Sequence, residues 1–492
     1  MPLHFVAIVL SCLISSVYFC MMMTTPGDSQ PQPSFWQDLK SAIKGTEADY
    51  TQIPLGRAIF LLAVPMILEL VMESTFAIVD IYFVGKLGAS AVSVVGLTET
   101  YLYLLYSVAM GLATAVTAIV ARRVGEKKAK DAGAVAVQSI FIALIASLPF
   151  AVGGIFFPKE LLGLMGADQW GIENGYRYTQ WMLGGNVIVV LLFLLNAVFR
   201  GAGDAAIAMR VLWIANGVNI LLDPLLIFGW GPFPALGIEG AAIATNIGRG
   251  VGVIIQLWLL FKGGKHIRAT MSQLYWDGKT MLAILRTSAG GIGQMIVSMT
   301  SWIFLMRILA GVGSEAVAGA TIALRVMMFT MMPAWGLSNA AATLVGQNLG
   351  AGHPERAESA VWKIGLYNMI FLVAVSFFYF FYNDSLMQIF TGDDRVITIG
   401  AEWLRILSYS FFVYGWWMVS VQAFNGAGDT RTPTLINLVF FWLIQIPLSY
   451  FLAIYLDLEH SGVFWGVFVS ETSVGLFTLW LFKKGRWKTV RV

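Results

Sequence analysis

The chain is 492 residues long, and 58% of its residues are hydrophobic while 12% are charged. Soluble globular chains carry about 25% charged residues, so this composition leaves too little polar surface for a protein surrounded by water. The net charge of +3 is too small to indicate nucleic-acid binding. Both cysteines, Cys12 and Cys20, precede residue 21, which excludes a disulfide framework or a cysteine metal site in the rest of the chain.

The first 50 residues differ from the rest. Leu3 to Met23 is an apolar run that lacks a basic n-region and an A-x-A-like cleavage site. We interpret residues 1–22 as an upstream extension of a protein that functionally begins near Met22 or Met23; a signal peptide or signal anchor is the alternative. The polar, proline-containing segment that follows is expected to be a flexible cytoplasmic lead-in. Residues 1–50 are therefore predicted to form an N-terminal extension and lead-in.

Twelve apolar segments follow this lead-in. Each is long enough to cross a bilayer, which takes about 20 mostly apolar residues in a helix. Their approximate limits are 58–85, 91–120, 132–157, 176–199, 207–229, 237–261, 283–310, 316–345, 360–382, 398–424, 434–457 and 461–482. The sequence predicts an all-α membrane protein with twelve transmembrane helices.

The loops between these segments alternate in basic character. Residues 122–130, residues 262–286 and the C-terminal tail are rich in Lys and Arg, whereas the loop that contains Asp393 and Asp394 is acidic. Cytoplasmic loops carry the excess of Lys and Arg in membrane proteins. With twelve spans, every basic loop falls on one side. Both termini are therefore predicted to be cytoplasmic, in a bacterial-type cytoplasmic (inner) membrane.

The chain contains an internal repeat. At an offset of 225 residues, FRGAGD at 199–204 overlays FNGAGD at 424–429, and Gly88 aligns with Gly313. One register holds without gaps over more than a hundred residues, as the further match of Gly125 with Gly350 shows. Chance similarity between apolar segments does not maintain such a register, so the two halves of the chain are duplicates.

Each repeat holds six predicted helices. Because six is even, both repeats enter the membrane from the same side, as in a parallel repeat related by a pseudo-twofold axis along the membrane normal. The sequence therefore predicts two six-helix lobes: an N-lobe at 51–265, and a C-lobe with a cytoplasmic tail at 266–492. Such halves are common in transporters, and the duplication disfavours a channel or a receptor.

Two helices of the first half contain acidic residues. Helix 1 carries Glu69, Glu73 and Asp80, which fall on one helical face at the spacing i, i+4, i+11. Helix 5 carries Asp223, with Asn219 one turn before it. A charge at the bilayer centre costs at least about 2.5–3.5 kcal/mol, so an intramembrane acid indicates a function.

The repeat provides an internal comparison for these groups. The offset of 225 pairs Glu69 with Gln294, Glu73 with Ser298, Asp80 with Leu305, Asn219 with Ile444 and Asp223 with Leu448. The second half thus builds the same scaffold without them. By contrast, Asp204 and Asp429 occur in both halves and are interpreted as helix-cap aspartates. For Asp223, which directly precedes Pro224, a local cap for a broken helix is the alternative.

The segment PMILELVMESTFAIVDIYFVG at 65–85 resembles the first helix of multidrug and toxic compound extrusion (MATE) antiporters. The two GAGD loops, NILLDPLLIFG at 219–229 and GIEGAAIAT at 237–245 are also similar to this family. The resemblance covers roughly residues 50–485. It implies two six-helix lobes around a central cleft, and export of amphipathic organic compounds driven by entry of H⁺ or Na⁺.

The distribution of acids resembles one branch of that family. The sodium-coupled branch has acids in helices 7 and 10. Helix 7 of this chain has none, and helix 10 has only Glu402, near its outer end, so the pattern is similar to the DinF-like branch, with its coupling site in the first lobe. Carried over by motif, the cation-coupling candidates are Asp80, Asn219, Asp223, Asn196 and Thr245. Glu73 is a further candidate, at a position where the family has an uncharged polar residue.

The resemblance also implies a mechanism. Oxygen ligands from Asp80, Asn219 and Asp223 would suit Na⁺, because hard cations prefer oxygen. Two buried carboxyls could equally exchange a proton. Pro65 removes a helix hydrogen bond and is the predicted hinge. We expect protonation or Na⁺ binding at Asp80 and Asp223 to change the bend of helix 1 and expel the substrate from the first lobe.

The main hypothesis is a monomeric cation-coupled antiporter whose partners are small organic compounds and the lipid bilayer. No catalytic residue, no cofactor other than the transported H⁺ or Na⁺, and no nucleic-acid partner is expected. A lipid-linked oligosaccharide flippase is the alternative within transport. An intramembrane transferase is disfavoured, because the loop at 262–283 has no recognisable spacing of His266, Arg268 and Asp277.

Overall fold

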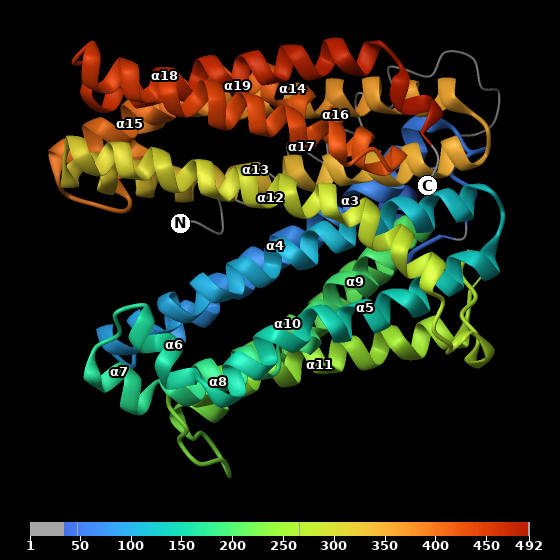
Figure 1. Cartoon of the computed structure of the whole chain (residues 1–492), viewed down its shortest axis with the longest axis horizontal. Helices are drawn as coiled ribbons and strands as arrows, with labels where there is room; N and C mark the ends of the chain where they lie inside the picture. Colours follow the sequence, from blue (N-terminus) through green and yellow to red (C-terminus); the bar gives the residue numbers. More distant parts are fainter. Residues whose placement is uncertain (1–33, 47, 265, 491–492) are drawn as a thin grey trace. The chain divides into compact units, whose positions relative to one another are not determined.

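The computed structural model describes residues 34–46, 48–264 and 266–490, so the predictions for residues 1–22 lie outside the described part of the chain (Figure 1). The described chain is helical almost throughout. Its first helices are α2 (Phe35–Lys44), α3 (Leu55–Gly85), α4 (Ala89–Gly125), α5 (Ala129–Phe156), α6 (Pro158–Leu164), α7 (Gln169–Asn174), α8 (Tyr176–Gly184), α9 (Asn186–Ala202), α10 (Ala205–Phe228) and α11 (Ile238–Lys262).

The second half of the described chain is also helical almost throughout. Its elements are the 3₁₀ turn η1 (Met271–Gln273), α12 (Gly278–Val312), α13 (Ser314–Gly350), α14 (Pro354–Gln388), α15 (Asp394–Ser408), α16 (Phe411–Ala427), α17 (Arg431–Asn437), η2 (Leu438–Gln445), α18 (Ile446–Tyr450), η3 (Phe451–Tyr455), α19 (Glu459–Lys483) and the 3₁₀ turn η4 (Arg486–Thr489). Here η2 and η3 are π-helical, and together with α17 and α18 they form one span.

The prediction of twelve spans is confirmed. Among the described residues, eleven spans are long and apolar enough to cross a membrane; one of them, Tyr176–Ala202, combines α8 and α9. The pair α15 and α16 forms the twelfth when taken as one span, and it is bent by 64°. The break falls at Tyr409 and Ser410, where no proline marks it in the sequence.

The lead-in contains a helix, α2, so the prediction of a flexible segment is wrong for residues 35–44. The backbone N–H of Ser34 donates to Gln37 Oε1 at 3.1 Å at the start of the helix. Asp38 is buried and accepts from Arg57 Nε at 3.0 Å, which ties α2 to the start of α3. Burial raises the pKa of the Asp38 carboxyl, and the Arg57 guanidinium opposes this rise.

The contacts divide the chain into two compact units. The N-unit is Leu68–Ser288, and the C-unit consists of the chain up to Ile67 and from Ala289 onwards. In the N-unit, α9 packs against α4 and α5, and α10 packs against α11. In the C-unit, α16 packs against α13 and α14 in the corresponding way. The predicted lobe limits of 51–265 and 266–492 stay a prediction.

The duplicated GAGD motif has a packing role in both units. A Cβ on Gly201 would lie 2.8 Å from the carbonyl oxygen of Thr117, and a Cβ on Gly426 would lie 2.2 Å from that of Ala342. Both pairs are related by the offset of 225 residues. The first glycine of the motif therefore lets one helix approach the backbone of another, α9 on α4 and α16 on α13.

The rest of the motif ends one helix and starts the next. Gly203 and Gly428 have φ values of +91° and +89°, a left-handed conformation that glycine adopts without strain. Asp204 is the residue that caps the start of α10. Asp429 accepts from Thr432 N at 3.2 Å and from Thr432 Oγ1 at 2.6 Å. The contacts of Asp429 support its interpretation as a cap residue, while for Asp204 the support is its position at the N-cap of α10.

Candidate functional site

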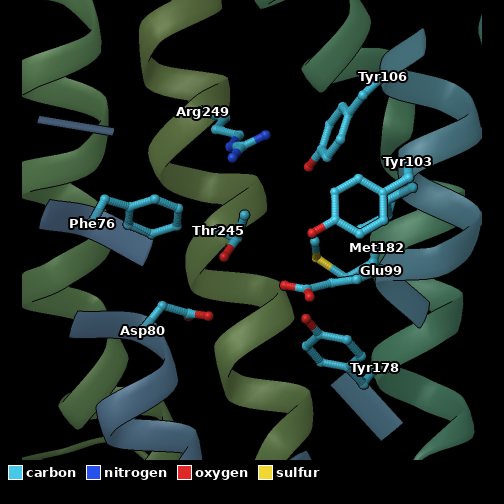
Figure 2. A pocket seen from close by; sticks show the side chains of 10 residues that line it. Phe76, Asp80, Glu99, Tyr103, Tyr106, Tyr178, Met182, Thr245 and Arg249 are labelled. Atoms are coloured by element: carbon cyan, nitrogen blue, oxygen red, sulfur yellow. The ribbon is translucent and has the colours of Figure 1, made fainter. Parts of the chain in front are cut away.

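The predicted residue Asp80 lies at the wall of a small cavity in the N-unit (Figure 2). The cavity has a volume of 80 Å³, and α3, α4, α8 and α11 supply its lining. The residues that line it are Phe76, Asp80, Glu99, Leu102, Tyr103, Tyr106, Tyr178, Met182, Thr245 and Arg249. Drug-sized ligands occupy pockets of about 300–1,000 Å³, so this cavity suits an ion, a few waters or the head of a larger molecule.

Asn219 and Thr245 form a polar contact beside Asp80. Asn219 Nδ2 donates to Thr245 Oγ1 at 3.0 Å, and both side chains are buried, at 2% and 6% exposure. The close packing of α10 on α11 makes this contact possible, because a Cβ on Gly248 would lie 3.0 Å from Asn219 Cβ. Thr245 also lines the cavity that contains Asp80, so the same side chain contacts Asn219 on α10 and belongs to the wall that includes Asp80.

Asp223 is fully buried one turn after Asn219. Neither of its carboxyl oxygens, nor Oδ1 of Asp80, has a hydrogen-bond partner among the described residues. Asp80 is the neighbouring acid that acts electrostatically on Asp223. Helix α10 continues without a break through Pro224 to Phe228, so the alternative of a cap for a broken helix is wrong. Four predicted residues, Asp80, Asn219, Asp223 and Thr245, are thus brought together.

Glu73 lies two turns before Asp80 on α3 and has different partners. Its Oε1 accepts from Arg249 Nη2 at 3.3 Å, and its Oε2 accepts from Asn216 Nδ2 at 3.0 Å. The Arg249 side chain is 9% exposed, and its guanidinium also lies 5.8 Å from the Phe76 ring. Glu73, whose side chain is 36% exposed, therefore forms a partly exposed ion pair with a basic residue in the cavity wall, and its contacts differ from those of Asp80.

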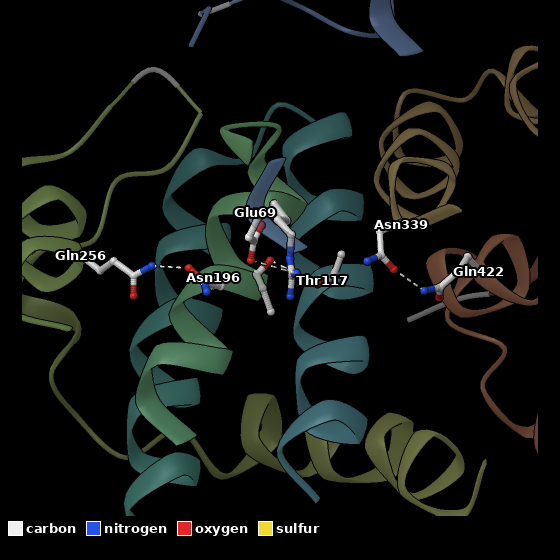
Figure 3. A network of polar contacts seen from close by, with 8 residues as sticks. Glu69, Thr117, Asn196, Gln256, Asn339 and Gln422 are labelled. Atoms are coloured by element: carbon white, nitrogen blue, oxygen red, sulfur yellow. Dashed lines mark hydrogen bonds and ion pairs between the residues drawn. The ribbon is translucent and has the colours of Figure 1, made fainter. Parts of the chain in front are cut away.

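The predicted residue Asn196 contacts Gln256 (Figure 3), which is not a member of this group. Its Oδ1 accepts from Gln256 Nε2 at 2.5 Å, and both side chains are buried. Gln256 follows Thr245 by eleven residues on α11, a separation of about 16 Å along the helix. Asn196 therefore cannot share an ion with Thr245 in this conformation.

Glu69 forms a second buried ion pair in the N-unit. Arg200 Nη1 lies 3.4 Å from Glu69 Oε1, and the two side chains are 18% and 6% exposed. Figure 3 shows Glu69 with its contact, and Thr117 nearby on α4. Thr117 Oγ1 donates to the carbonyl of Ala197 on α9 at 3.2 Å. The three acids of α3 thus have three different surroundings, although all lie on the side of the helix that faces the unit.

The C-unit has uncharged counterparts for both ion pairs. Asn425 Nδ2 donates to Gln294 Oε1 at 3.4 Å, and these residues are Arg200 and Glu69 shifted by 225. Asn437 Nδ2 donates to Ser298 Oγ at 3.2 Å, and Ser298 is the counterpart of Glu73. Near them, Gln422 donates to Asn339 (Figure 3). The N-unit therefore has charges where the C-unit has neutral hydrogen bonds.

The counterpart of Glu73 has an amide partner of its own. Ser298 contacts Asn437, which lies four residues before the position that an offset of 225 assigns to Asn216. The span of Asn437 contains the π-helical segment η2, whereas α10 is α-helical. Asn219 and Asp223 correspond to Ile444 and Leu448 at an offset of 225, and to Phe440 and Ile444 at the offset of this contact. The second half therefore lacks both polar groups at either offset.

For two charged residues of the cavity the sequence left the role open: Glu99 as a helix-packing or a cavity residue, and Arg249 as a basic residue in or near a span. Glu99 on α4 and Arg249 on α11 line it together with Asp80. The available signal was the presence of each charge inside an apolar span, but the partners depend on which helices are neighbours. No group of three or more His, Cys, Asp or Glu suited to a metal ion occurs among the described residues. Any cation held here would use amide, hydroxyl and carboxyl oxygens.

One protein-family model, MatE, matches residues 65–225 and matches again at 291–451. The chain belongs to the MatE family. The two matches cover more than half of the chain with the same module, which agrees with the internal repeat. The first match contains Asp80, Asn219 and Asp223, whereas Thr245 and Arg249 lie beyond its end.

Several curated proteins resemble this MatE chain along most of its length. It is 27% identical to a probable multidrug resistance protein NorM of Thermotoga maritima over 429 residues, which is 87% of this chain and 92% of the relative. It is 26% identical to an FAD transporter of Shewanella oneidensis over 398 residues, 80% of this chain and 88% of the relative.

Solved structures of MATE proteins share the fold. A MATE structure in the bent conformation has a TM-score of 0.82 at 23% identity, over 92% of this chain and 98% of that one. An outward-facing MATE family transporter also has a TM-score of 0.82 at 23% identity, over 94% of this chain and 100% of that one. The predicted family and the two-lobe helical fold are confirmed. The DinF-like branch stays a prediction.

Proposed function

We propose that this MatE protein is a cation-coupled antiporter that exports amphipathic organic compounds by alternating access. The observation that carries the proposal is the buried group of Asp80, Asn219, Asp223 and Thr245 inside membrane-spanning helices. Carboxyls buried in a bilayer are costly unless they have a function. The names of the relatives, which are multidrug resistance proteins and transporters, support export of organic compounds.

The chemistry of the group supports coupling to H⁺ or Na⁺. Two neighbouring carboxyls in a site without bulk water repel each other when both are charged, so binding of one cation between them is favourable. Asn219 and Thr245 add an amide oxygen and a hydroxyl, which are ligands that a hard cation accepts. A proton would serve the same electrostatic purpose by neutralising one carboxyl.

The position of Pro65 supports the predicted hinge. Pro65 lies inside α3 and removes one of its backbone hydrogen bonds. The contacts of α3 change from one compact unit to the other after Ile67. Asp80 lies fifteen residues after Pro65. Neutralising its carboxyl would change the contacts of the part of α3 that follows Pro65 and leave the contacts of the part before Pro65 unchanged. This is the proposed connection between cation binding and transport.

The charges of the loops support the predicted orientation. The alternating pattern of Lys and Arg favours an orientation with both termini in the cytoplasm, and we propose a bacterial-type inner membrane as the location. A protease-cleavable tag after Val492 tests this: it should be cut in inside-out vesicles and protected in spheroplasts. The opposite pattern would reverse the assignment of the two membrane faces.

Coupling is tested by efflux of a fluorescent cation from loaded vesicles, with the pH gradient and the Na⁺ gradient imposed separately. Asp80→Asn and Asp223→Asn should each abolish gradient-driven export while insertion into the membrane is unchanged. Glu402→Gln is the matched control, because this intramembrane acid is held by His460 and Ser461 at 3.2 and 2.5 Å. Normal gradient-driven export by Asp80→Asn would refute the proposal.

A further inference from the structure

The turn between α4 and α5 and the linker after α11 enclose a basic pocket in the N-unit. Its volume is 490 Å³, and its lining residues are Lys127, Lys128, Ala129, Lys130, Asp131, Gly264 and Arg268. The Lys128 ammonium is already paired with Glu126 at 3.0 Å. The other three cations are accompanied by one acid, Asp131, and none of the three forms an ion pair within the part of the chain that the structure describes. The pocket therefore has an excess of positive charge.

The linker that forms one wall of this pocket is fixed on α5 by contacts with the backbone. The N–H of Arg268 donates to the carbonyl of Ala129 at 3.3 Å, and Gln273 Nε2 donates to the carbonyl of Lys130 at 2.9 Å. Gly133 allows the linker to approach, because a Cβ there would collide with the carbonyl oxygen of Arg268. The fold therefore holds the two basic segments together, and the pocket is not a chance gathering of surface lysines.

The repeat shows that the scaffold does not require these charges. Lys127 and Gly352, which are 225 residues apart in the two equivalent turns, have φ values of +61° and +77°. Glycine adopts this left-handed conformation without strain, whereas lysine does so at a cost. The same offset pairs Lys130 with Glu355. The N-unit thus keeps a strained lysine where its copy has glycine, and a base where its copy has an acid, and such strain is typical of functional sites.

Exposed aromatic side chains on the same linker indicate where the membrane begins. Tyr275 and Trp276 are 58% and 63% exposed. Gln138 Nε2 donates to the carbonyl of Tyr275 at 2.8 Å, and the Trp276 ring lies 6.3 Å from that of Phe141. Gln138 is nine residues after Ala129, about 14 Å further along α5. Because Tyr and Trp favour the boundary between headgroups and acyl chains, the pocket is placed on the water side of this boundary, where lipid phosphates lie.

We propose that this pocket binds the headgroup of an anionic phospholipid, whose acyl chains lie beside Tyr275 and Trp276. Lys127, Lys130 and Arg268 hold the phosphate, and the planar guanidinium suits two of its oxygens at once. Basic pockets at the cytoplasmic ends of spans recognise acidic headgroups in this way. A zwitterionic lipid fits less well, because the pocket repels its quaternary ammonium group. The inference does not depend on the antiport proposal.

The test is native mass spectrometry of the full-length protein, delipidated in detergent and titrated with phosphatidylglycerol and phosphatidylcholine of the same acyl chains. The wild type should bind phosphatidylglycerol about tenfold more tightly or better. The variants are taken from the C-unit. Lys127→Gly removes one charge and should weaken binding of phosphatidylglycerol about fivefold, and Lys130→Glu reverses a charge and should weaken it about thirtyfold. Neither should change the binding of phosphatidylcholine.

Three controls separate this role from folding and from general charge effects. Without lipid, Lys127→Gly should unfold at the wild-type temperature or above it, because glycine relieves the strain of the turn. Lys127→Arg keeps the charge and should bind phosphatidylglycerol like the wild type. Lys159→Gln removes one charge just beyond the other end of α5, where Lys159 lies 4.6 Å from the Tyr176 ring, and should leave binding unchanged.

Equal affinity of the wild type for both lipids would overturn the inference, and so would wild-type binding of phosphatidylglycerol by Lys127→Gly and Lys130→Glu. An equal loss in Lys159→Gln would mean that only the net charge matters. Glycerol phosphate that displaces the lipid at the lipid's own concentration would make the pocket a site for free phosphates and not for a lipid. Failure of the antiport proposal is a separate result, in which lipid binding persists but export responds to neither ion gradient.

Discussion

The buried ion pair of Glu69 and Arg200 allows a sharp test of how the two halves differ. Its counterpart in the C-unit is the neutral pair of Gln294 and Asn425, with the same separation of 3.4 Å. The perturbation is therefore taken from the protein itself. Arg200→Asn replaces one member with its counterpart, and Glu69→Gln together with Arg200→Asn transplants the whole neutral pair into the N-unit.

The magnitudes follow from burial. Arg200→Asn leaves Glu69, which is 4% exposed, without its guanidinium. Breaking a buried pair on one side costs about 3–5 kcal/mol, and we expect the lower end because the Arg200 side chain is 18% exposed. The double variant buries no charge and keeps a hydrogen bond, so its free energy of unfolding should stay within about 1 kcal/mol of the wild type.

The assay is reversible chemical unfolding in mixed micelles, read as a double-mutant cycle that includes Glu69→Gln alone. The loss caused by Arg200→Asn should shrink as the pH falls, because a protonated Glu69 no longer buries a charge. A double variant as unstable as the single one would refute the reasoning, and so would a single variant as stable as the wild type. Either result would mean that the two pairs are not equivalent.

Two further predictions concern the cavity wall and the GAGD glycines. Glu73→Gln removes the carboxylate that pairs with Arg249. The Arg249 guanidinium should then move toward Asp80 and Glu99 and weaken binding of a cationic dye by about tenfold. Glu73→Asp keeps the charge and should bind the dye like the wild type, and unchanged dye affinity in Glu73→Gln would contradict the prediction. Gly201→Ala and Gly426→Ala should each lower the free energy of unfolding by about 1–3 kcal/mol, because the added Cβ meets a backbone carbonyl at 2.8 and 2.2 Å. Gly217→Ala is the control, since its Cβ would meet nothing within 4 Å, and equal effects at all three glycines would argue against a packing role.

Much of the scaffold was predictable because the bilayer imposes a length and a polarity on each helix. The twelve spans follow from runs of about 20 apolar residues, and the duplication follows from the GAGD motif. The break between α15 and α16 was not predictable, since residues 398–424 contain no proline and the bend falls at a short Ser-Tyr-Ser segment inside the predicted span. The helix α2 was missed although Ser34 and Gln37 form a capping box at its start, whereas its contact with α3, through Asp38 and Arg57, joins residues 19 apart.

The candidate site was predictable in part. The spacing along one helix placed Glu69, Glu73 and Asp80 on one side of α3, and the spacing along α10 joined Asn219 to Asp223. The distance of Asn196 from this group was not predictable. The resemblance assigns each residue to a helix, but it does not say which residues of different helices lie at the same depth in the membrane.

The sequence by itself determined that this chain is a duplicated, twelve-span membrane protein whose first half holds acids in helices 1 and 5 that the second half lacks. These conclusions depend on the composition and the residue spacing within each helix and on the alignment of the two repeats, none of which requires knowing which helices are neighbours. Only the tertiary structure decided which acid meets which partner: Glu69 contacts Arg200, Glu73 contacts Arg249, and Asp80 lies between Asp223 and Glu99. The physical reason is that a charge in a membrane is stabilised by side chains from other helices, and helix packing sets those neighbours.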